Sequence, residues 1–227
     1  MRTVIFLALT AIWGCSSERR ATEPLTPGKS NYQQVTGDDS SETRSRWDAL
    51  FSTHQYVFGK DPAKFLQVHV GKLPIGRALD IAMGEGRNAV FLAKKGFSVD
   101  GVDISEVALR KARRLAKENQ VSINTIYADL ATYAIKPGHY DVIVNIDYLQ
   151  RSLVPHIKRG LRKGGVVVFE NNTVEQLNNP SGKSMNRDFL LETGELKKLF
   201  SDFEILVYLE TNDGAEAKAS LVARKRD

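Results

Sequence analysis

The sequence has few of the side chains that bind metals or form covalent cross-links. Among its 227 residues there is one cysteine, Cys15, so it can form neither a disulfide within the chain nor a cysteine-based zinc site. Its four histidines do not show the HExxH or HxxxH spacing of a zinc enzyme. We therefore expect no metal centre.

The sequence signatures of two common enzyme classes are also missing. There is no GxSxG motif of a serine hydrolase and no GxxxxGK[ST] motif of a P-loop protein. The net charge is only +5, and the densest basic stretch, "LRKARRLAKEN" at residues 109–119, has the apolar spacing of a surface helix. We interpret this stretch as a solvated helix face, so we expect no nucleic-acid partner.

Residues 1–15 have the pattern of an export signal. Arg2 precedes an apolar stretch at residues 3–13, which is shorter than the ~20 residues that cross a bilayer but is typical of a signal peptide. The stretch ends in "IWGC", which resembles the bacterial lipobox, although Trp13 stands where a small residue is usual. The pattern predicts lipid attachment at Cys15 and a membrane-associated lipoprotein. The alternative is a buried N-terminal helix in a cytoplasmic protein, with an incidental thiol.

The composition of the chain changes after the first segment. Residues 16–44 are polar, contain Pro, Gly and Ser, and show no apolar periodicity, so we expect a disordered tether. Residues 45–227 have the pattern of one folded domain, which we expect to be a monomer.

The folded part alternates short apolar runs with helical patterns. A helix closed by Gly96 follows the first run, and Ser105 is placed to cap a helix that begins at Glu106. Two further runs, joined by a turn at 211–217, have the pattern of a C-terminal hairpin. The pattern predicts an α/β, Rossmann-like, doubly wound fold with a mostly parallel seven-stranded sheet. The expected strands lie near residues 77–83, 97–105, 123–130, 140–147, 163–171, 203–210 and 218–226.

Acidic residues and glycines follow three consecutive expected strands. The stretch Gly84-Glu85-Gly86 allows a close backbone approach to a ligand, and Asp80 lies four residues before it. Asp103, after the second strand, can accept both hydroxyls of a ribose, or it can belong to a helix cap. Asp129, after the third strand, can accept from the exocyclic amine of a base, or it can be a surface turn residue. Because the carboxyl ends of parallel strands meet at one edge, these residues predict a nucleoside site.

Two nucleoside cofactors fit such a site. NAD brings a pyrophosphate to the helix N-terminus, whereas S-adenosylmethionine brings a sulfonium and an ammonium and has no phosphate. The extra acid Asp80 suits a cationic ligand and does nothing for a pyrophosphate. This difference favours S-adenosylmethionine.

The stretch "ALDIAMGEGRNAVFLAKKGFSVDGVDIS" at residues 78–105 resembles the nucleoside-binding motif of class I S-adenosylmethionine-dependent methyltransferases. It is most similar to their tellurite-resistance and thiopurine-type branch. The stretch "RWDALFSTHQYVFGKDPAKFL" at residues 46–66 is similar to the N-terminal segment of that branch, and residues 140–171 resemble its fourth and fifth strands. One departure is Ala82-Met83, where the family has Gly-Cys.

The resemblance implies a role for each matching position. Residues around the methionine part would be Asp80, Gly84, Glu85 and Gly86; Asp103 would bind the ribose, with Ile104 against the adenine, and Asp129 and Leu130 would flank the base. Asn145 would lie beside the methyl group, and Phe58 and Gly59 would belong to a segment that folds over the cofactor.

Methyl transfer is an in-line displacement in which the enzyme mainly positions the nucleophile, so few diagnostic catalytic residues are expected. Tyr148 could form a wall of the acceptor pocket and Arg151 could pair with an anionic acceptor, although each could equally have a structural role. There is no Asn-Pro-Pro-Tyr motif after the fourth strand, which disfavours methylation of base amines. We expect a small-molecule acceptor: a soft oxyanion, a thiol or a small metabolite.

Two other functions stay open. One is a nicotinamide-binding oxidoreductase, which neither Asp80 nor the C-terminal hairpin supports. The other is a catalytically silent envelope lipoprotein that retains the methyltransferase fold, because S-adenosylmethionine is a cytosolic metabolite and would be scarce outside. The presence of both glycines and all three acids argues against a decayed site. An uncleaved N-terminal anchor would keep the domain on the cytosolic side.

Overall fold

The computed structural model describes residues 40–226. The expected signal segment at residues 1–15, its lipid-attachment residue Cys15 and residues 16–39 of the expected tether lie outside the described residues. None of the helices in the described part combines the length and the apolar character that a bilayer crossing requires.

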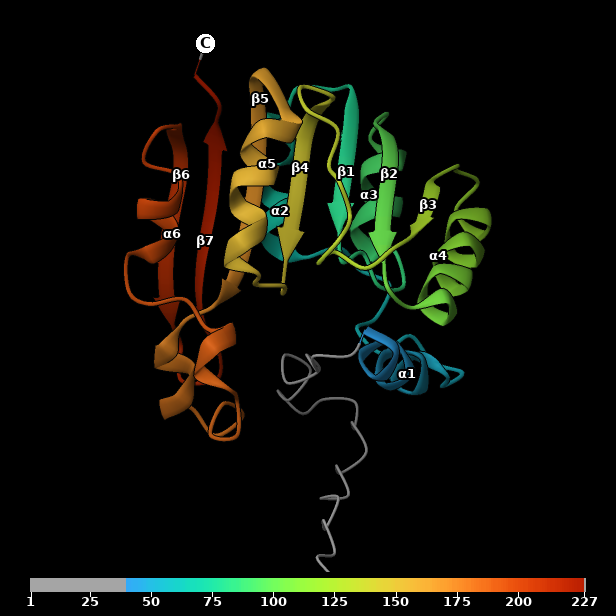
Figure 1. The fold of residues 1–227 in the computed structure, drawn as a ribbon, viewed down its shortest axis with the longest axis horizontal. Helices are drawn as coiled ribbons and strands as arrows, with labels where there is room; N and C mark the ends of the chain where they lie inside the picture. The colour runs from blue at the N-terminus through green and yellow to red at the C-terminus, as the bar shows by residue number, and fades with distance from the viewer. Residues whose placement is uncertain (1–39, 227) are drawn as a thin grey trace, which may run out of the picture.

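A seven-stranded sheet with the strand order β3-β2-β1-β4-β5-β7-β6 forms the centre of the protein (Figure 1). All neighbouring strands are parallel except at β7, which is antiparallel to both β5 and β6. The expected fold class, a Rossmann-like α/β sheet with a C-terminal hairpin, is therefore confirmed. The strands are β1 (Arg77–Ile81), β2 (Ser98–Asp103), β3 (Asn124–Tyr127), β4 (Tyr140–Ile146), β5 (Leu161–Asn172), β6 (Glu204–Asn212) and β7 (Ala217–Arg224).

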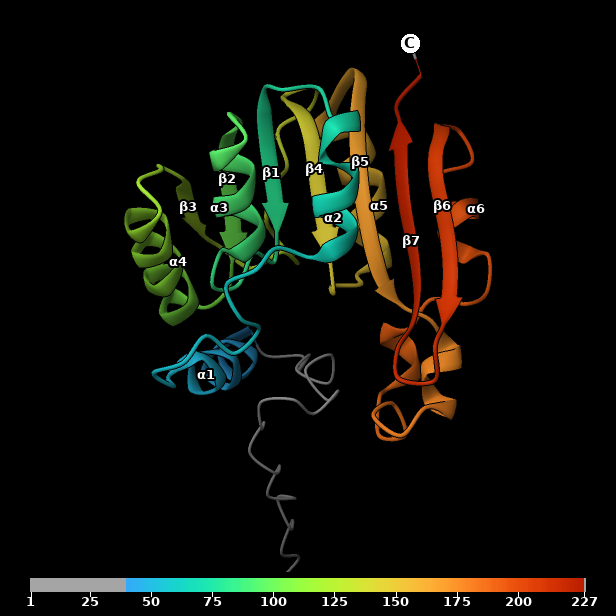
Figure 2. The same cartoon turned by 180° about the vertical axis from the view of Figure 1, so that it is seen from behind.

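Helices cover both faces of the sheet, α5 and α6 on one face and α2 and α3 on the other (Figures 1 and 2). Alternate residues of each central strand enter two separate cores: Ile143 packs with α5, whereas Val142 and Val144 pack with α2 and α3. This explains why the strands read as continuous apolar runs. The helices are α1 (Ser40–Phe51), α2 (Lys64–His69), α3 (Arg87–Lys94), α4 (Glu106–Glu118), α5 (Val154–Gly160) and α6 (Glu195–Leu199), with short 3-10 helices η2 (Val70–Lys72), η3 (Arg151–Leu153), η4 (Val174–Asn178) and η5 (Arg187–Phe189).

The helix ends have the expected local causes. Ser105 caps α4, because its side chain accepts a hydrogen bond from the Ala108 N–H at 3.1 Å. Gly96 follows α3 with a φ of 92°, a conformation that glycine adopts without steric cost.

The folded part begins earlier than expected. Helix α1 starts at Ser40, so the last five residues of the expected tether, 40–44, are helical. The cause is tertiary: Asp48 of α1 accepts hydrogen bonds from the Ser105 hydroxyl at 2.6 Å and from the Val107 N–H at 3.2 Å. These contacts hold α1 against the start of α4, beyond the carboxyl ends of the strands (Figure 1).

A second segment at the same end of the sheet was not expected from the sequence. Residues 173–193 contain η4 and η5 and lie beyond the carboxyl end of β5, across the sheet edge from α1 (Figures 1 and 2). One of their anchors is polar: buried Gln176 accepts from the Ala217 N–H and donates to the Ala215 carbonyl. The carboxyl edge of the sheet is thus flanked by two segments outside the sheet.

Candidate functional site

A cavity of about 420 Å³ lies at the carboxyl ends of the parallel strands. It opens where the strand order reverses between β1 and β4, the place where ligands bind in open α/β sheets. Three groups of residues line it: the strand-end loops, helix α1 with the segment after it, and η5. The residues that line the cavity include Trp47, Phe51, Phe58, Gly59, Gly84, Glu85, Arg87, Asp103, Ile104, Asp129, Leu130, Asp147, Tyr148 and Phe189.

The loop after β1 takes a backbone path that needs small residues. Gly84 and Gly86 have φ angles of 54° and 85°, and a Cβ on Gly86 would lie 2.7 Å from the Cβ of Ala112. Ala82 also has a positive φ, 49°, which is strained for a residue with a side chain. The next residue, Met83, packs its side chain against Gly101 of β2. A Cβ on Gly101 would lie 1.8 Å from the Met83 sulfur, so this packing needs a glycine at position 101. The Ala82-Met83 departure is therefore accommodated by local strain and by Gly101.

Asp103 fixes the glycine loop. One carboxylate oxygen accepts from the Gly84 N–H at 2.7 Å and the other from the Ser105 N–H at 2.8 Å. The side chain is 7% exposed, and burial raises its pKa to about 6 against the opposing effect of these backbone donors. Since a carboxylate has room for about four hydrogen bonds, Asp103 retains acceptor capacity for a ligand.

Asp80 lies deeper and is only 1% exposed. One of its carboxylate oxygens has no hydrogen-bond partner among the described residues. Burial raises its pKa to about 7, while Arg87 and the Ala89 N–H pull the pKa down. Asn145, at the end of β4, is equally buried and its side-chain oxygen is also unpaired. Two buried oxygens at the ends of β1 and β4 therefore have unused acceptor capacity.

Asp129 and Leu130 reach the cavity from the loop after β3, and Ile104 reaches it from the loop after β2. Asp129 accepts a hydrogen bond from the Ala131 N–H at 2.8 Å, as an aspartate in a turn does. It therefore has a turn role as well as a place at the cavity. Predicted residues from all three strand ends, Gly84, Asp103 and Asp129, thus meet at one cavity. Asp80, Gly86 and Asn145 are not among its lining residues.

The carboxylate of Glu85 binds the segment that follows α1. Its backbone belongs to the glycine loop, but its carboxylate accepts from the Val57 N–H at 2.7 Å and forms an ion pair with Lys111. These contacts pair the negative charge of Glu85 with a positive charge of the protein itself, that of Lys111. Glu85 also lines the cavity, so its expected cofactor contact stays a prediction while its carboxylate holds the segment after α1.

The two catalytic candidates separate in the structure. Arg151 does not line the cavity: its guanidinium binds both carboxylate oxygens of Glu195, at 2.6 and 2.8 Å, and the carbonyls of Asp188 and Leu190. The structural alternative holds for this residue. Tyr148 does line the cavity and donates to the Gln150 side chain at 2.6 Å, and burial raises its pKa above the usual tyrosine value. Tyr148 therefore stays a neutral wall residue.

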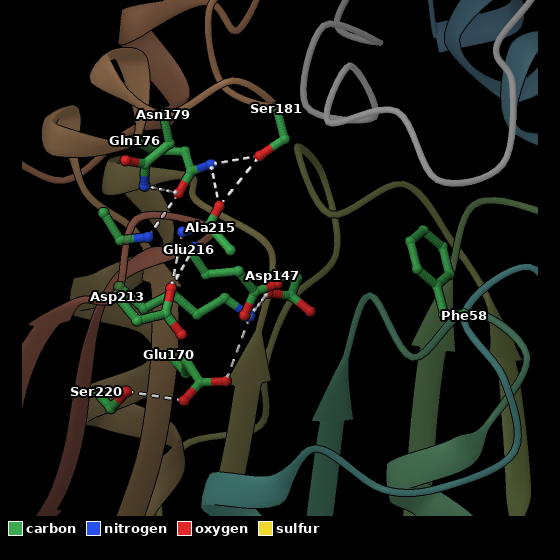
Figure 3. Close-up of polar contacts among 12 residues, drawn as sticks. Phe58, Asp147, Glu170, Gln176, Asn179, Ser181, Asp213, Ala215, Glu216 and Ser220 are labelled. Carbon is green, nitrogen blue, oxygen red and sulfur yellow. Dashed lines mark hydrogen bonds and ion pairs between the residues drawn. The ribbon is translucent and has the colours of Figure 1, made fainter.

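An ion-pair chain at the end of β4 was not expected from the sequence. Arg87 donates to Asp147 at 3.0 Å, and Lys218 lies 3.4 Å from Asp147 and 3.8 Å from Glu170. Ser220 completes the chain by donating to Glu170 (Figure 3). Asp147 has a positive φ of 60°, which aims its side chain between the two cations. No motif joins these positions, since they come from α3, β4, β5 and β7.

The aromatic walls come from both flanking segments. Trp47 stacks on Phe51 with ring centroids 5.7 Å apart, and Phe58 meets Phe51 edge-on at 6.1 Å. Phe58 lies on the side of the site away from Asp147 (Figure 3). Phe189 of η5 lines the cavity from the other flanking segment. The family resemblance of residues 46–66, with Phe58 and Gly59 expected over the cofactor, signalled the first wall, and nothing signalled the second.

Comparison with known proteins identifies the central part of the chain. Residues 78–165, from β1 into β5, match the family of methyltransferase domains. This stretch is similar to a methyltransferase domain and makes up less than half of the chain. The matched stretch contains the glycine loop and all three acids, and S-adenosylmethionine is the cofactor of this domain family.

A relative among characterised proteins is the ubiquinone biosynthesis O-methyltransferase of Bordetella bronchiseptica, which is 28% identical over 157 residues. The match covers 66% of this chain and 65% of that protein, so the chain spans slightly under two thirds of that relative's length.

Two solved structures share the fold. Magnesium protoporphyrin IX methyltransferase from Synechocystis, with S-adenosylmethionine bound, has a TM-score of 0.61 at 18% identity, covering 84% of this chain and 98% of that one. TehB from Haemophilus influenzae has a TM-score of 0.61 at 20% identity, covering 81% of this chain and 67% of that one.

Proposed function

We propose that the whole protein is an S-adenosylmethionine-dependent methyltransferase that acts on a small-molecule acceptor. The observation that supports this most is the unpaired, buried oxygen of Asp80 next to the glycine loop. A buried carboxylate without a partner is costly, and a cationic ligand nearby would remove that cost. S-adenosylmethionine carries such cations, whereas a nicotinamide dinucleotide brings phosphates to the same loop.

The other residues of the cavity fit the rest of the cofactor. Asp103 has acceptor capacity left for the ribose hydroxyls, and Asp129 has a second carboxylate oxygen for a base amine. Ile104 and Leu130 supply apolar contacts for a flat base. Gly84 lines the cavity and lets the backbone approach a ligand without a side chain in the way.

The cofactor supplies an activated methyl group, so the chain's own task is to orient the acceptor and exclude water. Trp47, Phe58, Tyr148 and Phe189 form aromatic walls suited to this task. The cavity, at about 420 Å³, lies within the range of small-molecule sites, roughly 300–1,000 Å³. These features favour a small metabolite, a thiol or a soft oxyanion as acceptor, and we assign the chain to the tellurite-resistance and thiopurine-type branch on the residues at 46–66 and 78–105.

We also propose that lipid on Cys15 attaches the protein to a membrane. The support is the apolar stretch at residues 3–13 that ends in Gly14-Cys15. Growth with a labelled fatty acid should label the wild-type chain, and Cys15→Ser should remove the label. Equal labelling of both chains would contradict the proposal.

The cofactor is tested by calorimetry of the full chain with S-adenosylmethionine and, separately, with NAD. We expect micromolar binding of S-adenosylmethionine and none of NAD. Asp129→Asn should weaken binding while leaving the fold intact, because among residues 40–226 its carboxylate accepts one hydrogen bond, from the Ala131 N–H. Binding of NAD alone would indicate an oxidoreductase, and binding of neither would favour the silent envelope lipoprotein.

A further inference from the structure

One lysine of the basic helix α4 is buried against the segment that follows α1. The ammonium of Lys111 donates hydrogen bonds to the carbonyls of Phe51 at 3.2 Å, Thr53 at 3.0 Å and Gln55 at 2.6 Å. Carbonyls after the last turn of a helix have no intrahelical partner, and a cation is well suited to them. Lys111 therefore holds the chain where it leaves α1.

The same ammonium forms an ion pair with Glu85 of the glycine loop. The Glu85 side chain is 3% exposed and that of Lys111 is 15% exposed, so water does little to screen this pair. Glu85 in turn accepts from the Val57 N–H at 2.7 Å. One buried pair thus joins α4, the glycine loop and the 51–58 segment.

The 51–58 segment covers the candidate cofactor site. Phe51 and Phe58 both line the cavity, and the Phe51 ring lies 3.6 Å from the place where a Cβ on Gly84 would be. Tyr56 packs on α4, its hydroxyl donating to the Lys111 carbonyl at 3.2 Å. The segment cannot lift away from the cavity without separating its backbone from Lys111 and Glu85.

The neighbouring basic residues of α4 behave differently. Arg113 and Arg114 form exposed pairs with Glu106 and Glu118, and Lys117 is exposed. Exposed pairs of this kind contribute little to stability. The solvated-face interpretation thus holds for the other charged residues of 109–119 but not for Lys111.

We propose that Lys111 and Glu85 are positioning residues that hold the 51–58 segment closed over the cofactor and so set how long the cofactor stays bound. The identity of the retained ligand rests on the proposed function, whereas the closure of the 51–58 segment does not. Loss of either partner leaves a buried charge uncompensated, which favours an open segment. Glu85 thereby couples the loop that binds the ligand to the segment that covers it.

The first test is hydrogen–deuterium exchange on the ligand-free full chain. Lys111→Met and Glu85→Gln should each speed exchange of the Val57 and Phe58 amides about tenfold or more, with the amides of β4 and β5 unchanged. Lys117→Met is the matched control, because it makes the same change on an exposed position of the same helix. Unchanged protection of residues 57–58 would overturn the proposal, and so would equal loss of protection in all strands.

The second test measures release of S-adenosylhomocysteine by stopped-flow competition. We expect Lys111→Met to raise the dissociation rate about tenfold, and Lys117→Met to leave it at the wild-type value. Faster exchange of residues 57–58 without faster release would overturn the role in retention. If the wild-type chain bound no nucleoside at all, the proposed function would fail, while the exchange experiment would still decide whether the pair holds the segment.

Discussion

Asp80 makes the proposed cofactor site sensitive to pH. Its carboxyl is 1% exposed, has one unpaired oxygen and titrates with a pKa of about 7, because burial disfavours the charged form. A cationic ligand gains from the ionised acid and gains nothing from the neutral one. Affinity for S-adenosylmethionine should therefore rise with pH through the pKa of Asp80.

The magnitude follows from the ionised fraction. With a pKa of about 7, Asp80 is about 3% ionised at pH 5.5 and about half ionised at pH 7, a ratio of about fifteen. Asp103, with a pKa of about 6, changes by only about fourfold over the same interval. Below pH 7 the α-amino group of the ligand, whose pKa is about 8, stays charged and adds no slope of its own.

Calorimetry at pH 5.5, 6, 6.5 and 7 measures this dependence. Wild-type affinity should rise at least about fifteenfold across the series, whereas Asp80→Asn should bind weakly and rise only about fourfold, the share that belongs to Asp103. Asp103→Asn should keep the steeper slope. A flat wild-type profile, or wild-type affinity in Asp80→Asn, would refute the pairing of Asp80 with a cation.

The ligand-free protein should show the opposite trend in stability. The folded state holds a proton on Asp80 up to a pH of about 7, whereas the unfolded chain releases it near 4, so this group lowers the free energy of unfolding as pH rises between these values. Asp80→Asn should thus raise the thermal midpoint more at pH 8 than at pH 4. An equal change at both pH values in thermal unfolding would argue against a raised pKa.

Three substitutions test the packing around the site. Gly86→Ala should lower the free energy of unfolding by ~2 kcal/mol in denaturant titrations, because it combines a φ of 85° with a Cβ 2.7 Å from that of Ala112; a neutral result would contradict the close packing. Gly101→Ala should lower it by ~1–3 kcal/mol, with partial rescue by Met83→Ala, which vacates the space; absence of rescue would point to another cause. Arg151→Met should lower the thermal midpoint and leave cofactor affinity unchanged, since in the described part of the chain Arg151 binds Glu195 and two carbonyls and does not line the cavity; a loss of affinity would show that Arg151 contributes to cofactor binding.

The sheet was predictable because its strands are buried on both faces. Apolar runs such as 140–147 need no alternation when helices cover both sides, and the turns between them hold glycines or capping residues. The start of the folded part was placed too late because only Leu50 and Phe51 of the twelve residues of α1 are buried. Its position depends on the contact of Asp48 with Ser105, fifty-seven residues away, which no local pattern reveals.

The part of the candidate site whose position follows from the strand topology was predictable from the sequence. Asp103 and Asp129 end neighbouring parallel strands, so topology alone brings them together. Side-chain direction was not predictable: the carboxylate of Glu85, between the two glycines of the loop, turns to Lys111, and Arg151 turns to Glu195. Each side chain turns towards a partner on another element, Lys111 of α4 or Glu195 of α6, and only the tertiary fold brings these partners close.

The cavity has two kinds of wall, and they come from different parts of the chain. The strand-end loops of residues 78–165 supply the residues that fit the cofactor, while α1 with its following segment and η5 supply aromatic cover. Phe189 belongs to a segment held by Gln176 and has no part in the glycine loop. Phe189→Ala should therefore change which acceptors react while leaving cofactor affinity within about twofold, whereas Phe58→Ala should weaken cofactor binding. Equal loss of cofactor binding in both variants, measured by calorimetry, would show that the two walls enclose the cofactor together.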